Sequence, residues 1–438
     1  MRAAALRNNR VQFYGLFLAA FSLLFAAPAR SDEPGIVRVL LYDQNAPVEI
    51  AIKAKGGPVH LYAADFENEI ARLEDGQEAF VRRASNQLHV KIGATALFAS
   101  SLRVEPGPEA AFGSRVVEGA KVAGPGSSAA PSQLRHYQGQ LFVTVDDSDW
   151  QIRLINEVNV EDYVAAVISA EYGFDDLEGA KAMAVITRTY TLATLGKFGS
   201  EYDHVDHTMS QVYRGIDAVT PTMRRAVNDT RGQILSYDDE LIEAVYFSVS
   251  GGHTADNEDV WRSKAIPYLR GKPDPYGTGS PHARWSSRVS RPRLLAALTS
   301  AYRIPVSGFV ISERSTDGRV LKVDMLREDG GRMGIRANEF RMAVLQSFGD
   351  KSLRSTHFEA RRDGNEYVFE GSGNGHGVGL SQWGAHDLSL RGSSYREIID
   401  FYYTGVRLET LADLNARKGR PEVASSKPKE EPRSRIGW

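Results

Sequence analysis

The stretch from Asn156 to Tyr190 constrains the fold most strongly, because it predicts two consecutive helices separated by a sharp break. In residues 160–170 the apolar side chains recur at spacings of three and four, which is typical of a helix with one buried face. Asn159 is suited to cap the N-terminus of this helix, since its side-chain oxygen can accept a hydrogen bond from a free backbone N–H. A second helix is predicted from Leu177 to about Leu195.

Glu171 stands directly after the apolar face and before Tyr172 and Gly173, so we expect it at the C-terminus of the first helix. The helix dipole disfavours an anion at that end and partial burial disfavours it further, so both effects predict a raised pKa. Helix formation does not require a carboxylate there, whereas a general acid requires a raised pKa. A lone glutamate near a helix end is usually a solvated surface residue, and its importance therefore depends on other parts of the chain.

Composition narrows the class of protein. The chain has 438 residues, which predicts two or three domains, and its apolar fraction of 42% and charged fraction of 25% are those of a globular protein. The formal charge of −2 and the lack of a nucleic-acid-binding motif argue against nucleic acid as a partner. The absence of cysteine excludes disulfides, thiolate metal sites and a cysteine nucleophile.

The first 29 residues read as a secretory signal peptide. Three arginines precede the apolar run 11–27, and Ala27-Pro28-Ala29 provides a cleavage site of the A-x-A type. This pattern predicts export to the periplasm or cell envelope, with no stable membrane insertion after cleavage. An uncleaved anchor is the alternative, since the run is at the short edge of a spanning helix.

The chain as a whole predicts an α+β fold with a β-rich N-terminal accessory region followed by a mixed α/β catalytic domain with a central substrate cleft. Short β-type runs such as 36–42 and 88–92 alternate with turn signals in the first part. The predicted organisation is an accessory domain at 33–104, a Gly/Ala/Pro/Ser-rich linker at 105–132, the catalytic domain at 133–411 and a disordered tail at 412–438.

Within the catalytic domain the sequence predicts a series of further elements. They are strands at 137–145 and 151–156, an irregular loop at 201–215, helices at 221–230, 291–302, 338–345 and 395–403, and a hairpin of 234–237 with 241–250. The glycine-rich stretch 371–385 opens another helix, which Gly392 should stop.

The glycine-rich stretch does not match a phosphate-binding loop. His376 breaks the G-x-G-x-x-G spacing, and no Gly-Lys-Ser/Thr follows. Tight turns explain the glycines without a ligand. Asn374, His376, Gln382 and Trp383 nevertheless combine polar groups with one aromatic ring, which suits a carbohydrate.

Two other clusters suggest chemistries that their spacing does not support. Ser248 to Thr254 contains serines and His253, but G-x-S-x-G is not met, so a histidine that bonds within a cleft wall is the favoured interpretation over a serine hydrolase. His204 and His207 could form a metal site with His253, but the H-E-x-x-H spacing is absent and a polar surface loop is favoured.

Taken together, these stretches resemble the SpoIID/LytB family of bacterial cell-wall proteins. The resemblance covers about 250 residues, from Asn156 through Leu408. Its matching stretches are 156–164, 169–171, 181–190, 211–215, 230–233, 250–254, 260–261, 375–385 and 402–405.

The resemblance implies an activity and a partner. The sporulation member of the family is a lytic transglycosylase that cuts peptidoglycan glycan strands lacking stem peptides, and the LytB-type name carries an amidase-enhancer role. The family's essential glutamate matches Glu171. Some relatives hold zinc with cysteine and histidine before the Gln-Val-Tyr stretch, but this chain has Met209 and Ser210 there and no cysteine, so we expect neither that site nor any other cofactor.

In such a mechanism one glutamate is sufficient. It protonates the glycosidic oxygen and later accepts a proton from the 6-hydroxyl of the same sugar, so no second carboxylate is needed to activate water. Arg188 would pair with the lactyl carboxylate of N-acetylmuramic acid, or would form a structural salt bridge. The remaining residues expected to bind substrate are Tyr190, Gln211, Tyr213, Ser250, His253, Trp261, His376, Gln382 and Trp383.

Two rival functions remain open at this point. A non-catalytic envelope protein could bind glycan and stimulate an N-acetylmuramoyl-L-alanine amidase, and it would tolerate loss of Glu171. A true glycoside hydrolase would need a second carboxylate across the cleft, for which Asp162, Asp203 and Asp256 are candidates.

Overall fold

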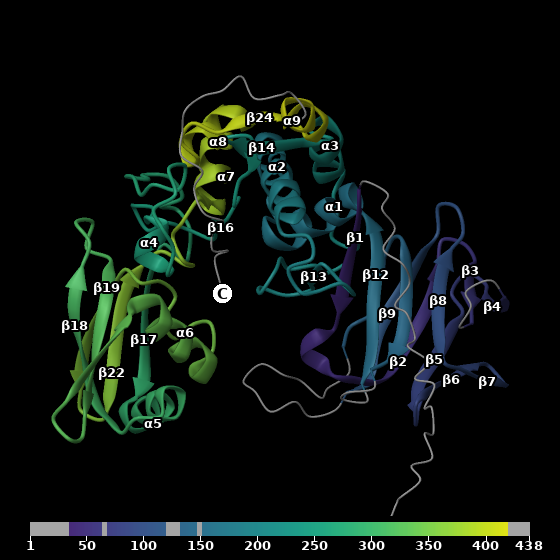
Figure 1. Cartoon of the computed structure of the whole chain (residues 1–438), viewed down its shortest axis with the longest axis horizontal. Helices are drawn as coiled ribbons and strands as arrows, with labels where there is room; N and C mark the ends of the chain where they lie inside the picture. Colours follow the sequence, from purple (N-terminus) through teal and green to yellow (C-terminus); the bar gives the residue numbers. More distant parts are fainter. Residues whose placement is uncertain (1–34, 64–67, 120–131, 147–150, 419–438) are drawn as a thin grey trace, which may run out of the picture. The chain divides into compact units, whose positions relative to one another are not determined.

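A computed structural model describes residues 35–63, 68–119, 132–146 and 151–418 (Figure 1). The predicted signal peptide lies outside the described residues. Among the helices that are described, none is long and apolar enough to cross a membrane. The structure confirms the predicted α+β fold with a β-rich N-terminal region.

Two sheets make up the N-terminal region of the described chain. One has the strand order β13-β1-β12-β11-β8-β3-β4 and the other β10-β9-β2-β5-β6-β7. The strands are β1 (Ile36–Leu41), β2 (Pro47–Lys55), β3 (Val59–Tyr62), β4 (Glu69–Leu73), β5 (Glu78–Ala84), β6 (Gln87–Ile92), β7 (Thr95–Ala99), β8 (Ser101–Pro106), β9 (Ala111–Gly119), β10 (Arg135–Tyr137), β11 (Gln140–Val145), β12 (Ile152–Asn159) and β13 (His204–Val205).

The first described strand, β1, pairs directly with the strand that leads into the central helices. β1 and β12 are antiparallel, and Ile36 lies opposite Asn159. The backbone N–H of Val160 donates to the carbonyl oxygen of Gly35 at 2.6 Å. The N-terminal region therefore shares a sheet with residues of the predicted catalytic domain, and it fixes the start of the first helix.

The predicted linker at 105–132 is wrong over residues 111–119, which form β9. This strand forms eight residue pairs with β2 and is largely buried. Its small residues fit a tight sheet position, since a Cβ at Gly119 would lie 2.4 Å from the carbonyl oxygen of Asn45. The small residues of this strand resemble a flexible linker in composition, but close packing requires them here. Residues 120–131 lie outside the described chain.

The two central helices form as predicted. They are α1 (Val160–Glu171) and α2 (Leu177–Ala193), and the side chain of Asn159 caps α1 by accepting from the backbone N–H of Glu161. Helix α2 packs against α1, against α3 (Pro221–Asp229) and against two C-terminal helices described below. Its buried alanines allow this close packing on several sides.

The segments after α3 form short pairings that bring distant parts of the chain together. They are β14 (Gln233–Tyr237), β15 (Glu240–Leu241), β16 (Tyr246–Phe247), α4 (Asn257–Val260), β23 (Leu380–Ser381), α7 (Gln382–Leu390), α8 (Tyr395–Tyr402), β24 (Arg407–Thr410) and α9 (Leu411–Lys418). The predicted second hairpin strand at 241–250 is wrong. Within this stretch only the short β15 pairs with β14, and β16 pairs with β23 instead.

The predicted disordered tail at 412–438 is wrong over residues 412–418, which belong to helix α9. Ion pairs hold this helix against the β14–β15 hairpin and against β24. Arg417 pairs with Asp239 of the hairpin turn and with Glu409 of β24, and Lys418 pairs with Glu240 of β15. A charged composition suggested disorder, but these charges have partners in the fold. The remainder of the tail lies outside the described residues.

Residues 284–372 build a second hydrophobic core around Phe309, Phe340 and Phe369. The elements are β17 (Arg284–Ser290), α5 (Arg291–Tyr302), β18 (Val306–Arg314), β19 (Val320–Arg327), β20 (Arg332–Arg336), α6 (Ala337–Phe348), β21 (Phe358–Asp363) and β22 (Glu366–Ser372). They form two three-stranded sheets, β17-β22-β21 and β18-β19-β20.

Candidate active site

Glu171 occupies the last residue of α1 and is half-buried. Its Oε1 accepts a hydrogen bond of 2.8 Å from the backbone N–H of Val212. Burial raises the pKa of this carboxyl, and this effect exceeds the opposing effects of the Val212 N–H, of hydrogen bonding to the Gln382 and Tyr246 side chains, and of the Arg214 charge. The net result is a carboxyl that holds its proton to higher pH than an ordinary glutamate.

The parallel pairing of β16 with β23 accounts for the meeting of Tyr246 and Gln382 at this carboxylate. Tyr246 lies opposite Leu380 and Phe247 lies opposite Ser381. Ser381 caps α7 by accepting from the backbone N–H of Gly384, so Gln382 is the first residue of that helix. Residues separated by more than 130 positions are thereby brought to one point.

Gln211 is buried behind Tyr246 and holds the phenol in place. Its Oε1 accepts hydrogen bonds from Thr191 Oγ1 at 2.9 Å and from the Tyr163 hydroxyl at 3.3 Å. Its Nε2 therefore faces the Tyr246 hydroxyl and donates to it at 3.2 Å. Tyr246 was not predicted from the sequence, and its only signal was its place just before the serine- and glycine-rich cluster.

His376 is neutral and supports β16. Its Nε2 bonds to the carbonyl oxygen of Tyr246 at 2.9 Å, and its Nδ1 accepts from the backbone N–H of Val378 at 3.1 Å, which fixes the proton on Nε2. Burial lowers the pKa of His376 to about 3. The ring centroid of Trp261 lies 4.9 Å away. His376 thus positions the Tyr246 backbone, with Trp261 packed behind it.

Three of the predicted substrate-binding residues are buried in the core. The exposed fractions are 5% for Tyr190, 5% for Trp261 and 1% for Tyr213. The Tyr213 hydroxyl donates to Asn156 Oδ1 at 2.7 Å. The prediction that these three rings bind substrate is therefore wrong, because they are part of the hydrophobic core.

Ser250 and His253 have different partners, and neither forms a serine–histidine pair with the other. Ser250 Oγ accepts from the backbone N–H of Gly252, and its hydroxyl bonds to Asp274. His253 Nδ1 lies 2.6 Å from the carbonyl oxygen of Thr254 and 3.7 Å from Asp317. This arrangement gives no activated serine.

Trp383 belongs to a small aromatic cluster on the segments that follow Glu171 and Gln382, which we call the Phe174 cluster (Phe174, Trp383 and His386). Phe174 stacks on His386 with ring centroids 4.1 Å apart, and Trp383 meets Phe174 edge to face at 4.8 Å. Asp176 bonds to His386 Nδ1 at 2.7 Å. All three rings are half-buried. Phe174 and His386 were not predicted, although they follow Glu171 and Gln382 by three and four residues.

Arg188 is 1% exposed and is fully engaged within the protein. Its guanidinium donates to both carboxylate oxygens of Glu161, at 3.0 and 2.6 Å, and to the carbonyl oxygen of Gln233 at 3.0 Å. Of the two roles predicted for Arg188, this geometry favours the structural salt bridge over contact with substrate.

The three candidate second carboxylates are also engaged in structural contacts. Asp162 pairs with Arg224 at 2.7 Å. Asp203 accepts backbone N–H bonds from Arg38 and Gly196, and Asp256 lies 3.2 Å from the guanidinium of Arg270. None of these contacts involves Glu171.

The histidines considered as metal ligands do not converge. His204 is buried with Nε2 at 3.3 Å from the carbonyl oxygen of Thr191, whereas His207 pairs with Asp43 at 2.9 Å. Within the described parts of the chain, no group of three or more His, Cys, Asp or Glu residues could hold a metal ion.

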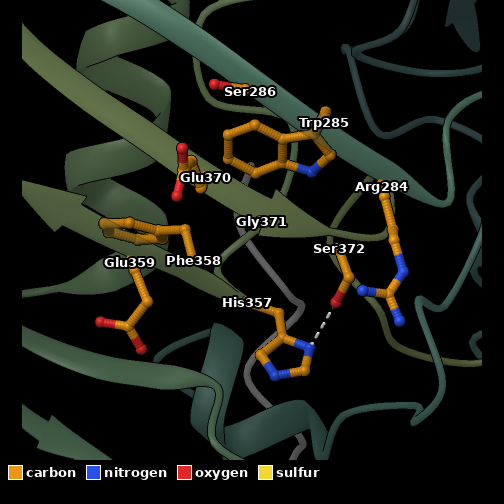
Figure 2. Close-up of a pocket in the computed structure, with 9 residues that line it drawn as sticks. All are labelled: Arg284, Trp285, Ser286, His357, Phe358, Glu359, Glu370, Gly371 and Ser372. Atoms are coloured by element: carbon orange, nitrogen blue, oxygen red, sulfur yellow. Dashed lines mark hydrogen bonds between the residues drawn. The ribbon is translucent and has the colours of Figure 1, made fainter.

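A separate depression of about 580 Å³ lies on the β17-β22-β21 sheet (Figure 2). The Ser372 hydroxyl lies 2.8 Å from His357 Nδ1. Figure 2 shows Arg284 next to Ser372, and Glu359 and Glu370 near Phe358. The depression is lined by residues of the second core's sheet and does not include Glu171.

Two family models match this chain, one in the part that contains Glu171 and the other in the part that contains the second core. A family model described as Stage II sporulation protein matches residues 148–237, which include Glu171. A second model, for a domain of unknown function, matches residues 276–379, which include the second core.

Individual relatives extend this similarity. An uncharacterised protein of Brachyspira hyodysenteriae is 28% identical over 89% of this chain and 96% of its own length. Stage II sporulation protein D of Bacillus amyloliquefaciens is 30% identical over 58% of this chain and 74% of its own length. The protein named Amidase enhancer from Bacillus subtilis is 30% identical over 53% of this chain, which spans only 38% of that relative.

Proposed function

Because the chain belongs to the SpoIID family, we propose that it is exported to the cell envelope and cleaves peptidoglycan glycan strands poor in stem peptides as a lytic transglycosylase. The names of its relatives, one of them an amidase enhancer, support a role at the cell wall. Glu171 is the single general acid and base in this proposal.

The observation that carries the proposal is the half-buried Glu171, whose pKa is raised by burial although Val212 and two side chains hydrogen bond to it. A general acid must be protonated when substrate binds, and it must also be held in one orientation. Burial supports the first requirement, and the Val212 N–H bond supports the second.

The reaction requires two proton transfers. The Glu171 carboxyl gives its proton to the glycosidic oxygen as the bond from that oxygen to C1 breaks, which leaves an oxocarbenium-like centre at C1. The 6-hydroxyl oxygen of the same sugar bonds to C1, and its proton returns to the Glu171 carboxylate. The products are a strand end with a free 4-hydroxyl and a 1,6-anhydro end, and the enzyme regains its starting protonation state.

The contacts of Asp162, Asp203 and Asp256 support a mechanism with one carboxylate. Each is held by an arginine or by backbone N–H groups, and none is left to activate a water opposite Glu171. An intramolecular hydroxyl needs less activation than water because it is already held beside the reacting carbon.

The Phe174 cluster supports binding of a sugar next to the acid. Phe174 and Glu171 lie on one segment, Trp383 and Gln382 on another, and their aromatic rings are half-buried. Aromatic rings bind the apolar faces of sugars, whose hydroxyls are left to hydrogen bond at the rim.

Digestion of purified glycan strands tests the proposal. Wild-type protein should give 1,6-anhydro ends by mass spectrometry, and Glu171→Gln should give none, because an amide cannot donate the required proton. Glu201→Gln, at an exposed glutamate, is the matched control and should leave the products unchanged. Reducing ends in place of anhydro ends would instead indicate hydrolysis and would refute the mechanism.

The alternative function is that of a glycan-binding amidase enhancer, which is favoured by the similarity to the Bacillus subtilis protein of that name. It predicts retained strand binding, stimulation of an N-acetylmuramoyl-L-alanine amidase, and no cleavage by either the wild type or Glu171→Gln. Anhydro ends that depend on Glu171 would contradict it.

A further inference from the structure

The acidic substituent of the glycan requires a cationic partner in the site. N-Acetylmuramic acid without a stem peptide carries a free lactyl carboxylate, which is ionised at neutral pH and calls for a cation in the site. Arg188 cannot supply it without giving up its buried bonds to Glu161. Arg224 already pairs with Asp162.

We propose that Arg214 pairs with the free lactyl carboxylate of N-acetylmuramic acid and thereby selects strands without stem peptides. This inference rests on the proposed function, since it concerns the same site. A guanidinium can bind a carboxylate through two parallel N–H bonds, which gives both affinity and orientation. A stem peptide converts the carboxylate to an uncharged amide and removes this interaction.

Arg214 is exposed, and among the described residues its guanidinium has no hydrogen bond or salt bridge. The residues around it are firmly held. Gln211 and Tyr213 are buried, Tyr213 N–H donates to Asp206 O at 3.2 Å, and Gly215 has a φ of +77°. A Cβ at Gly215 would lie 2.1 Å from the carbonyl oxygen of His136, so only glycine fits there. The backbone of Arg214 is thus fixed while its side chain is available.

Burial alternates along this segment, from buried Gln211 through half-buried Val212 and buried Tyr213 to exposed Arg214. The backbone N–H of Val212 binds the Glu171 carboxylate, and Arg214 is the second residue after Val212.

Charge effects agree with this placement. The Arg214 guanidinium lowers the pKa of both Glu171 and Asp206, so its charge acts on the site. Asp206 is the protein carboxylate that competes with a substrate carboxylate for Arg214. It is buried, however, and has other partners: it accepts a hydrogen bond from the backbone N–H of Tyr42 at 3.1 Å and lies 3.8 Å from Arg135. A substrate carboxylate on Arg214 would neutralise the cation and so help Glu171 to keep its proton.

The test compares two substrates made from the same strands. One retains free lactyl carboxylates, and in the other they are coupled to methylamine through a carbodiimide. We expect wild type to cleave the free-acid strands with a kcat/KM about tenfold higher, the size of one charge-assisted contact. Arg214→Gln should lose that advantage, so that its kcat/KM values on the free-acid and amide strands become about equal.

Arg225→Gln is the matched control, because this arginine lies on α3, outside the 211–215 segment, and has a side chain that is 68% exposed. It should discriminate as wild type does. Equal discrimination by wild type and Arg214→Gln would overturn the inference while leaving cleavage intact. Absence of anhydro products from wild type on both substrates would instead refute the proposed function.

Discussion

Replacing Arg188 by methionine should cost folding stability more than it costs recognition of substrate. Methionine keeps much of the side-chain volume but removes the guanidinium. The substitution would delete both bonds to Glu161 and the bond to the carbonyl oxygen of Gln233. Glu161 would keep only the 3.1 Å bond from the backbone N–H of Gly232.

The magnitude follows from the burial of the pair, whose side chains are 1% and 9% exposed for Arg188 and Glu161. Removing one partner of a buried pair leaves an uncompensated charge and costs about 3–5 kcal/mol. Replacing both partners, as in Arg188→Met with Glu161→Leu, removes the stranded charge. The double variant should therefore be more stable than Arg188→Met alone.

Urea denaturation followed by tryptophan fluorescence measures these differences, provided that the variants unfold in a single transition. Arg225→Met is the control. Among the described residues Arg225 forms one exposed ion pair, with Asp229, and its replacement should change stability by less than about 0.5 kcal/mol. Wild-type stability in Arg188→Met, together with selective loss of activity on free-acid strands, would refute the structural role and restore Arg188 as a substrate-binding residue.

Two further predictions concern the ionisation of Glu171. Tyr246→Phe removes a hydrogen bond that favours the ionised form of Glu171, so the pKa of Glu171 should rise. The alkaline limb of the pH–rate profile should then move to higher pH. An unmoved limb would show that Tyr246 does not act on the acid. Glu171→Gln should raise the free energy of unfolding at neutral pH. The folded pKa of Glu171 is raised, so the stability that this carboxyl contributes is fully present below its unfolded pKa and is lost as pH rises through its folded pKa. Glutamine has no charge and avoids this loss. Urea titrations at pH 7 and below about pH 4, the unfolded value, check this expectation, and an equal difference at both pH values would contradict it.

The sequence predicted the parts of the site that depend on local order. Apolar periodicity and Asn159 located α1, and the end of that periodicity placed Glu171 at the helix C-terminus. The dipole argument gave the right direction for the pKa of Glu171, while in the structure burial is the largest cause.

The partners of Glu171 could not be predicted in this way. Tyr246 and Gln382 reach the carboxylate only through the parallel β16–β23 pairing, which has no local sequence signature. The apolar periodicity of the sequence also does not show which arginine is buried. Arg188 is buried and Arg214 is exposed because of their long-range neighbours, not because of their local spacing. Composition misled at 105–132, where buried small residues of a strand resembled a linker.

The pairing of β1 with β12 also bears on how the chain matures. The two strands are separated by more than 100 residues, so β1 stays without its partner until most of the first 160 residues have been synthesised. An apolar strand with an open edge is prone to join other chains. The nascent polypeptide should therefore depend on a holding chaperone until β12 emerges, and only then can α1 settle with its terminal carboxyl in place.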